Sequence, residues 1–555
     1  MNRRPIDQQT IHQRRWWALA VMCVSLLTIT LDNTILNIAI PALERDLHAS
    51  TSQLQWIADG YILVFAGLLL TTGSLGDRFG RRGALSAGLA VFGAGSLLSA
   101  FAASATQLIF TRALMGIGAA LIMPATLSLL TNVFSDPRER GRAIGAWAAV
   151  AGAGGAIGPV VGGFLLSRFW WGSVFLINVP VVVVALVAGR FLLPPSKDPG
   201  APRLDPLGAV LSVVGLVALL WGIIEAPTKG WADQTVVAGF VAGAAILGGF
   251  VYWELQCSSP MLDVRFFRNR RFTAANAGIT MVYFAMFGSM FLVTQYLQTV
   301  LGFSPLQAGL RMLPTAGIML VVAPSAPRFV ERVGTKVVMG GGLVLASSGL
   351  ALMSQVPVAH GYAHLIVALG LMSGGMGLVM APATESIMGS LPPSKAGVGS
   401  AMNDTTRQMG GALGVAIIGS VMASSYRPGI GARLGSLQLP AGVLATAKGS
   451  VGGALDAARS LPAATGRLVA DAGRTQFVHG LRPSLLVASG VVLVVATIVF
   501  AFLPARAGDA REPVEGALDG LASLTFAEAE GALELGAAEA AGALERGAAD
   551  AGGRP

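Results

Sequence analysis

Long runs of hydrophobic residues recur along the whole chain, and short polar stretches separate them. Fourteen runs can be counted, at residues 16–40, 54–75, 84–103, 106–131, 143–166, 173–193, 208–226, 235–255, 272–300, 307–327, 337–356, 362–389, 398–423 and 482–503. A helix of about 20 apolar residues crosses the hydrocarbon core of a bilayer. The pattern therefore predicts an all-α membrane protein with 14 transmembrane helices.

The composition supports this prediction and excludes several classes of protein. Of the 555 residues, 54% are hydrophobic and only 12% are charged, whereas soluble proteins carry about 25% charged residues. Soluble enzymes, nucleic-acid-binding proteins and secreted disulfide-rich proteins are excluded on this ground. The two cysteines, Cys23 and Cys257, have neither metal-ligand spacing nor a disulfide pattern.

Lys and Arg gather in alternate loops between the runs. Twenty lie on the side that includes residues 1–15, whereas the short loops of the opposite side hold only Arg45, Arg168 and Lys229. Because basic residues mark cytoplasmic loops, we expect a multi-pass protein of the cell membrane with both termini in the cytoplasm. This asymmetry explains the net charge of +9 without a nucleic-acid partner. The preference for Arg over Lys, with abundant Ala and Gly, favours a bacterial source.

Short motifs recur at a nearly constant distance, which indicates two related halves. Residues 77–82 (Asp-Arg-Phe-Gly-Arg-Arg) match residues 331–336 (Glu-Arg-Val-Gly-Thr-Lys), and Met-Pro-Ala-Thr at 123–126 matches Ala-Pro-Ala-Thr at 381–384. The predicted organisation is a cytoplasmic N-terminus, a six-helix bundle, a linker with two extra transmembrane helices, a second six-helix bundle and a cytoplasmic tail: 1–15, 16–193, 194–271, 272–503 and 504–555.

Two segments lack the apolar pattern. Residues 424–479 are rich in Ala and Gly and are expected to form a partly disordered or weakly helical loop outside the cell. The acidic tail, residues 504–555, is expected to be mostly disordered. An amphipathic partner helix in the tail, built on Leu518, Leu521 and Leu544, is the alternative.

Charged residues inside the predicted spans are candidates for function because they are costly in a membrane. Asp32 and Asp59 lie in adjacent helices at similar depth, where one carboxyl group can hold a proton while the other stays ionised. A cation and a proton would compete for the same group, which is the basis of antiport. The alternatives are a structural hydrogen bond for Asp32 and a solvated position at the membrane surface for Asp59.

Other polar residues form a second set of candidates. Arg112 needs a partner in the bundle interior, either for coupling or as a structural ion pair. Asp404 and Arg407, three residues apart, are expected to pair with each other, and Glu385 is expected at a rim. The side chains that are candidates to line a cavity are Asn33, Asn37, Tyr61, Tyr283, Gln295 and Gln298.

Two glycine-containing motifs predict moving or closely packed parts. The loop with Gly73, Asp77, Arg78, Gly80 and Arg81 places an acid among basic residues, and Asp77 is expected either to pair with a neighbouring Arg or to lie at a helix N-terminus. Such a contact can break and reform as a latch, although an ordinary basic loop is the alternative. The second motif comprises Gly145, Gly154, Gly158, Pro159, Gly162 and Gly163. Gly154, Gly158 and Gly162 lie on one helix face, where small residues allow close packing, and Pro159 bends the helix.

The sequence contains no nucleotide-binding loop, no zinc-binding HExxH motif and no cysteine cluster. We therefore expect no metal and no cofactor, and an ion gradient as the source of energy. The membrane potential supplies about 2.3 kcal/mol per charge per 100 mV.

Several motifs resemble those of the major facilitator superfamily, over nearly the whole chain. Residues 73–82 resemble its loop between the second and third helices, and residues 108–118 its fourth-helix motif. Residues 31–41 (Leu-Asp-Asn-Thr-Ile-Leu-Asn-Ile-Ala-Ile-Pro) are similar to the first-helix signature of its 14-helix drug:proton antiporters, and residues 145–163 match their fifth-helix motif. Residues 175–180 and 296–305 fit the same branch. Gly172 follows Trp170-Trp171 where the family often has Trp-Arg-Trp, and Glu331 replaces Asp in the second-half loop.

This resemblance implies the major facilitator fold with two extra helices, and multidrug efflux by alternating access. It implies that Arg112 takes part in proton coupling and that the fifth helix seals the interface between the halves. The expected partners are a small amphipathic substrate, protons and the lipid bilayer, with the protein acting as a monomer. The alternatives are a dedicated exporter of a natural product, siderophore or lipid, and a membrane sensor acting through the tail.

Overall fold

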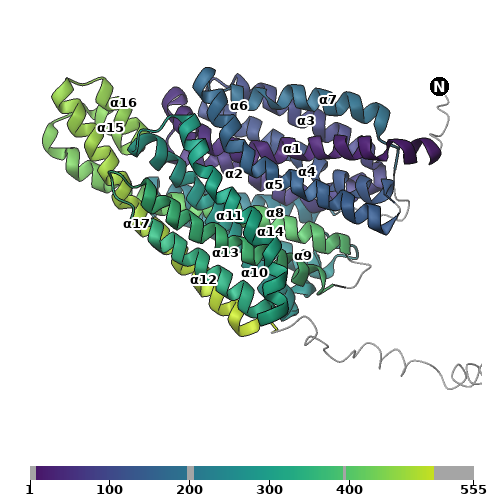
Figure 1. Ribbon diagram of the computed structural model, residues 1–555. Coiled ribbons are helices and arrows are strands. Elements are labelled where there is room, and N and C mark those ends of the chain that lie inside the picture. Colours follow the sequence, from purple (N-terminus) through teal and green to yellow (C-terminus); the bar gives the residue numbers. More distant parts are fainter. Residues whose placement is uncertain (1–7, 135, 197–204, 392–395, 505–555) are drawn as a thin grey trace, which may run out of the picture. The chain divides into compact units, whose positions relative to one another are not determined.

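The computed structural model describes residues 8–134, 136–196, 205–391 and 396–504, which contain helices and no strand. Figure 1 shows these helices gathered into two bundles. Some sequence-based predictions concern residues outside this part of the chain. They are the start of the N-terminus, the basic residues Lys197, Arg203 and Lys395, and the acidic tail after Pro504.

The first bundle is formed by the helices that precede residue 193. They are α1 (Gln8–Leu47), α2 (Thr51–Phe79), α3 (Arg81–Ala100), α4 (Ala105–Val133), α5 (Pro137–Arg168), α6 (Ser173–Leu176) and α7 (Asn178–Leu192). The short α6 and α7 together form one apolar span. Helix α2 is bent by 55° between Leu69 and Thr71.

The second bundle follows the two extra helices α8 (Pro206–Lys229) and α9 (Gln234–Gln256) and the short η1 (Val264–Arg268). Its long helices are α10 (Arg270–Gln295), which continues into the π-helical η2 (Tyr296–Val300), α11 (Pro305–Val333), α12 (Thr335–Met353), α13 (Tyr362–Met388), α14 (Ala396–Leu434) and α17 (Ala463–Phe502). Helix α8 contacts α2 and α14, one helix from each bundle.

Among the described residues, 13 helices are long and apolar enough to cross a membrane, and the bent α2 raises the number to 14. The predicted all-α class and the 14 spans are therefore confirmed. The two bundles also repeat one another in their packing. Helix α1 contacts α5 as α10 contacts α14, α2 contacts α4 as α11 contacts α13, and α3 contacts α7 as α12 contacts α17.

The repeat extends to the ends of individual helices. Helices α2 and α11 hold the same place in their bundles, and both begin with a capping box, Ser50 with Gln53 and Ser304 with Gln307. In each box the serine side chain and the glutamine side chain satisfy backbone N–H groups that the first helical turn leaves unpaired. Both helices end at a glycine with positive φ, Gly80 and Gly334, a conformation that glycine adopts without steric cost.

The expectation of a partly disordered or weakly helical loop at residues 424–479 is corrected by the structure. Helix α14 extends to Leu434, and η4 (Gly435–Leu437), α15 (Ala441–Gly449), α16 (Val451–Arg459) and the beginning of α17 fill the segment. The composition misled because alanine and glycine, which suggest a flexible loop, here allow short helices to lie close together. Val451, Ala454 and Ala457 of α16 are buried.

We call the end of the molecule that holds α15 and α16 the cap end, and the end where α1 begins and α17 ends the terminus end (Figure 1). Near the cap end, α5 and α11 approach so closely that a Cβ on Gly309 would overlap the backbone of Pro159, and a Cβ on Gly163 would overlap that of Pro305. Towards the terminus end, Gly145 and Gly152 of α5 have no atom within 4 Å of a Cβ position. The bundles are therefore tightly joined at the cap end.

Candidate functional site

A buried ion pair joins α1 to α4 in the first bundle. The Nη1 atom of Arg112 lies 2.5 Å from Oδ2 of Asp32, and both side chains are 1% exposed. A charge removed from water must find its compensation within the protein. Arg112, which the sequence predicted to need an interior partner, therefore finds it in Asp32.

Arg112 has further contacts that fix its orientation. Its Nε donates to the backbone oxygen of Ile57 over 3.2 Å, so the guanidinium also reaches α2. The guanidinium carbon lies 4.3 Å from the centre of the Tyr61 ring and 5.9 Å from that of Phe175. Stacking on two rings suits a planar guanidinium and not an ammonium group. Tyr61, a candidate to line a cavity, is fully buried against Arg112.

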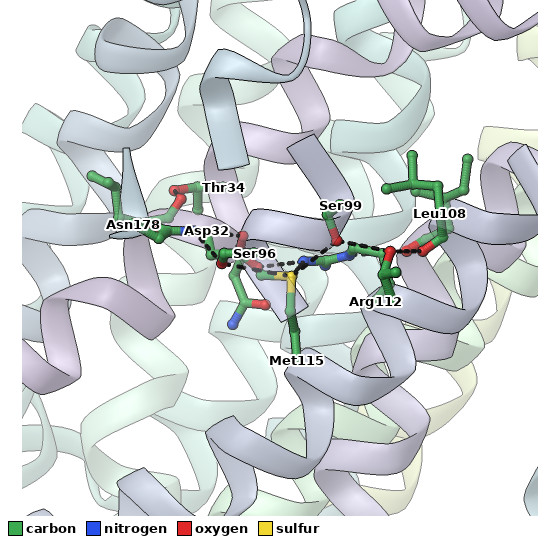
Figure 2. Close-up of polar contacts among 12 residues, drawn as sticks. Asp32, Thr34, Ser96, Ser99, Leu108, Arg112, Met115 and Asn178 are labelled. Carbon is green, nitrogen blue, oxygen red and sulfur yellow. Dashed lines mark hydrogen bonds and ion pairs between the residues drawn. The ribbon is translucent and has the colours of Figure 1, made fainter. Parts of the chain in front are cut away.

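Asn178 of α7 and Ser96 of α3 complete the polar group around Asp32 (Figure 2). The Nδ2 of Asn178 donates to Oδ1 of Asp32 over 3.2 Å and to Oγ of Ser96 over 3.3 Å. Ser96 lies in turn against the sulfur of Met115. The acid is thus contacted from α4 and α7.

Asp59 on α2 has a different environment. Its side chain is fully buried, and neither carboxylate oxygen has a hydrogen-bond partner among the described residues. This position differs from the solvated one that was the alternative prediction. Within the described part of the chain, no hydrogen bond or ion pair joins Asp59 to Asp32 or Arg112, although the backbone of Ile57, two residues away, accepts from Arg112. An unpartnered buried acid is costly and points to a bound ion or proton.

The glycines of α5 contact two different helices. Gly154, Gly158 and Gly162 face α1, where a Cβ would overlap Thr30 at the first position and Thr34 at the second, and would press on Ile35 at the third. Gly163, by contrast, faces α11 of the second bundle. The motif therefore packs α5 against α1 through Gly154, Gly158 and Gly162, and against α11 of the second bundle through Pro159 and Gly163.

Residues 73–82, expected to form a loop, are helical except for Gly80: they are the last turns of α2 and the first residues of α3. A short ion pair lies at this junction, at the terminus end. The Nε of Arg81 lies 2.6 Å from Oδ1 of Asp77. The backbone N–H of Arg81 donates to the oxygen of Ser196 over 2.8 Å, so the junction of α2 and α3 is also bonded to the segment after α7. Of the two predicted arrangements, pairing with a neighbouring Arg is the observed one. Arg78 is exposed and lies over the ring of Phe79.

A second polar cluster lies on α14 in the second bundle. Asp404 and Arg407 pair as expected, with 3.6 Å between Oδ1 and Nη1. Arg407 also donates to Oγ1 of Thr384 over 3.1 Å and lies 5.6 Å from the centre of the Tyr283 ring. Glu385 is exposed. The cluster is partly accessible, since the Arg407 side chain is 24% exposed.

The remaining predicted side chains lie outside these clusters. Asn37 donates to the backbone oxygen of Asn33 one turn earlier, and Gln295 donates to that of Phe291. Gln298 donates over 2.9 Å to the backbone oxygen of Ile38, so it links α1 to the second bundle. These amides belong to helix packing and to the joined cap end, not to the ion-pair site.

Sequence reasoning missed Asn178, Gln55 and Glu44 as members of a site. Gln55 of α2 donates across the bundles to the backbone oxygens of Val415 and Ala416. The available signal was a polar side chain inside an apolar helix, which is costly unless it has a partner. Within the described ranges, no group of three His, Cys, Asp or Glu side chains is placed to hold a metal ion.

Comparison with known proteins agrees with this architecture. The family model described as Major Facilitator Superfamily matches residues 22–415. The multidrug efflux pump LfrA of Mycolicibacterium smegmatis is 36% identical over 489 residues, covering 88% of this chain and 96% of that protein. The tetracenomycin C resistance and export protein of Streptomyces glaucescens is 34% identical over 508 residues, covering 90% and 94%.

The fold is also that of solved transporters. The crystal structure of a bacterial homologue of the human lysosomal transporter Spinster superposes with a TM-score of 0.60 at 17% identity, over 88% of this chain and 98% of that one. The match of the family model over most of the chain, together with relatives that align over most of both chains, shows that this protein belongs to the major facilitator superfamily of membrane transporters.

Proposed function

We propose that the protein exports small amphipathic molecules, cationic ones among them, from a bacterial cell in exchange for protons. The observation that carries this proposal is the buried pair of Asp32 and Arg112 beside an unpartnered Asp59 on the next helix. A proton or a cationic substrate would supply the partner that Asp59 lacks. The relatives named as a multidrug efflux pump and as a resistance and export protein support export as the direction of transport.

The charge distribution supports a cytoplasmic location of the terminus end and of both chain termini. The cap end would then face the outside. Because the bundles are joined at the cap end by Gln55, Gln298 and the contact of Gly163 with Pro305, the conformation corresponds to an inward-facing state. Alternating access requires these contacts to break when the site opens outward.

No cofactor is required by this scheme, since the gradient of protons across the membrane supplies the energy. Both bundles and the interface between them come from one chain, and we therefore expect a monomer to be sufficient. The Asp404–Arg407 cluster, on the second bundle, is the secondary candidate for coupling.

The test is proton-driven uptake of tetraphenylphosphonium, a lipophilic cation, into inverted membrane vesicles. Uptake by the wild type should be lost in Asp32→Asn and strongly reduced in Asp59→Asn. Asp233→Asn is the matched control, because Asp233 caps α9 in a loop far along the chain from the site and Asn caps equally well. Unchanged uptake in both Asp32→Asn and Asp59→Asn would refute the proposal.

A dedicated exporter of one antibiotic is the second candidate, favoured by the relative named for tetracenomycin C. Accumulation of several unrelated dyes and antibiotics in cells that lack other pumps separates the two. Reduced accumulation of many compounds supports multidrug export, whereas an effect on one compound supports the dedicated exporter.

A further inference from the structure

The side chain of Asn178 lies at the first residue of α7 and is 1% exposed. The two oxygens of Asp32 have different donors: Oδ2 accepts from Arg112 and Oδ1 accepts from Nδ2 of Asn178. Figure 2 shows the amide and the carboxylate directed toward one another. The oxygen that Arg112 leaves free is therefore the one that Asn178 occupies.

The amide of Asn178 is only half satisfied. Its Nδ2 carries two hydrogens, which are directed to Asp32 and to Ser96. Its own Oδ1 is buried and has no hydrogen-bond partner among the described residues. A buried acceptor without a donor is uncommon in proteins and requires an explanation.

We infer that Asn178 is a positioning residue of the coupling site. Its amide donates to ionised Asp32, and it rotates by about 180° to accept from Asp32 when that acid is protonated. This inference rests on the proposed proton coupling at Asp32. A proton on Oδ1 of Asp32 would point at an N–H donor in the observed orientation. After the rotation the unused Oδ1 of Asn178 takes that place, so the same side chain serves both states of the acid.

The other groups around Asp32 do not provide this second role. Arg112 on α4 is a donor only and remains positively charged. Tyr61 on α2 interacts electrostatically with both Asp32 and Arg112, but its hydroxyl makes no hydrogen bond to Asp32 and has no partner among the described residues. Ser96 on α3, which accepts from Asn178, is neutral, and so is Gly154 on α5, whose oxygen accepts from Thr34 of α1. Among the described residues, Asn178 is thus the neighbour of Asp32 that can both donate and accept at Oδ1.

The experiment measures binding of tetraphenylphosphonium to the purified full-length protein as a function of pH. In the wild type, protons compete with the cation, and binding is lost on acidification with a defined midpoint. Asn178→Leu removes, at nearly constant volume, the hydrogen-bond partner of both states of the acid. The ionised acid loses the stronger hydrogen bond, so the midpoint should move to higher pH by about one unit, a tenfold gain in proton affinity. Asn276→Leu is the matched control, because Asn276 is a buried amide in α10 whose side chain, among the described residues, bonds only the backbone oxygen of Phe272 in its own helix.

The outcomes separate the inference from the function on which it rests. If Asp32→Asn keeps the wild-type midpoint, the proposed coupling at Asp32 fails. If Asp32→Asn abolishes the midpoint but Asn178→Leu leaves it where it was, only the role of Asn178 is overturned.

A second measurement needs no change at Asn178 and so decides the matter even if Asn178→Leu does not fold. The infrared difference spectrum of the wild type between alkaline and acidic buffer should contain a side-chain amide carbonyl band that shifts as Oδ1 gains a donor. The band should be absent in Asp32→Asn. A wild-type spectrum without such a band contradicts the inference.

Discussion

The carboxylate of Glu44 accepts a hydrogen bond from the backbone N–H of Gly452 over 2.8 Å. Glu44 lies in the last turn of α1 in the first bundle and is 2% exposed, whereas Gly452 lies in the first turn of α16. A carboxylate is stabilised at a helix N-terminus by the unpaired N–H groups and the helix dipole. Thr51 of α2 donates to the oxygen of Gly449 nearby. Helices α15 and α16 at the cap end are thus hydrogen-bonded to α2 and α1 of the first bundle.

The first prediction concerns Gly452→Ala. A Cβ at this position would overlap the Glu44 carboxyl group, so the side chain must leave the helix end. We expect hydrogen–deuterium exchange at residues 449–453 to rise about tenfold, the effect of losing a hydrogen bond to a charged group. Transport should slow because the closed state at the cap end is weakened.

Gly442→Ala is the control for this experiment, since a Cβ at Gly442 in α15 has no atom within 4 Å. It should leave exchange and transport as in the wild type. Equal hydrogen–deuterium exchange at residues 449–453 in the two variants would show that Glu44 does not stabilise the beginning of α16.

The second prediction concerns the charge balance of Asp32 and Arg112. Arg112→Gln leaves Asp32 as a buried acid without its cation, which should lower the free energy of unfolding by about 3–5 kcal/mol. Adding Asp32→Asn should restore part of this loss, because the orphaned charge is removed as well. Thermal unfolding of the wild type, Arg112→Gln and the double variant in detergent measures the effect. If the double variant is no more stable than Arg112→Gln, the two groups do not form an energetically coupled pair.

Much of the architecture could be predicted because hydrophobic runs and loop charges report directly on membrane spans. The 14 spans, the two related halves and the two extra helices follow from patterns that the bilayer imposes on each helix separately. An interior partner for Arg112 could also be predicted, because an unpaired cation inside a membrane helix is energetically costly.

The partners themselves could not be read from the sequence. The spacing of Asp32, Arg112 and Asn178 in the chain carries no information on their distances, which depend on how three helices rotate about their axes. The helices within residues 424–479 were missed for another reason. Their alanines and glycines are typical of flexible loops, whereas contacts distant in sequence, among them the one with Glu44 and the packing of α16 on α17, stabilise the short helices.

The third prediction compares two glycines of α5. A Cβ on Gly158 would overlap the Thr34 side chain, whereas Gly155 has no atom within 4 Å of its Cβ position. Gly158→Ala should therefore force α5 away from α1 and cost about 1–3 kcal/mol, while Gly155→Ala should be neutral or stabilising. Melting temperatures in detergent measure the cost. The decay of a pH gradient in proteoliposomes tests whether the altered packing lets protons leak, and similar values for both variants would contradict a role for this face.

The fourth prediction concerns the ion pair between Asp77 and Arg81. Because these side chains are 30% and 17% exposed, Arg81→Gln should change the free energy of unfolding by less than about 1 kcal/mol. It should nevertheless slow transport severalfold, since Arg81 also bonds Oγ of Ser196 and so joins three segments at the terminus end. Binding of tetraphenylphosphonium should be unchanged, because binding does not require the bundles to move. Arg78→Gln is the control, because it removes the charge of an exposed neighbour, and it should slow transport less than Arg81→Gln. If Arg78→Gln slows transport as much or more, residues 73–82 act through their overall positive charge and not through the Asp77–Arg81 ion pair.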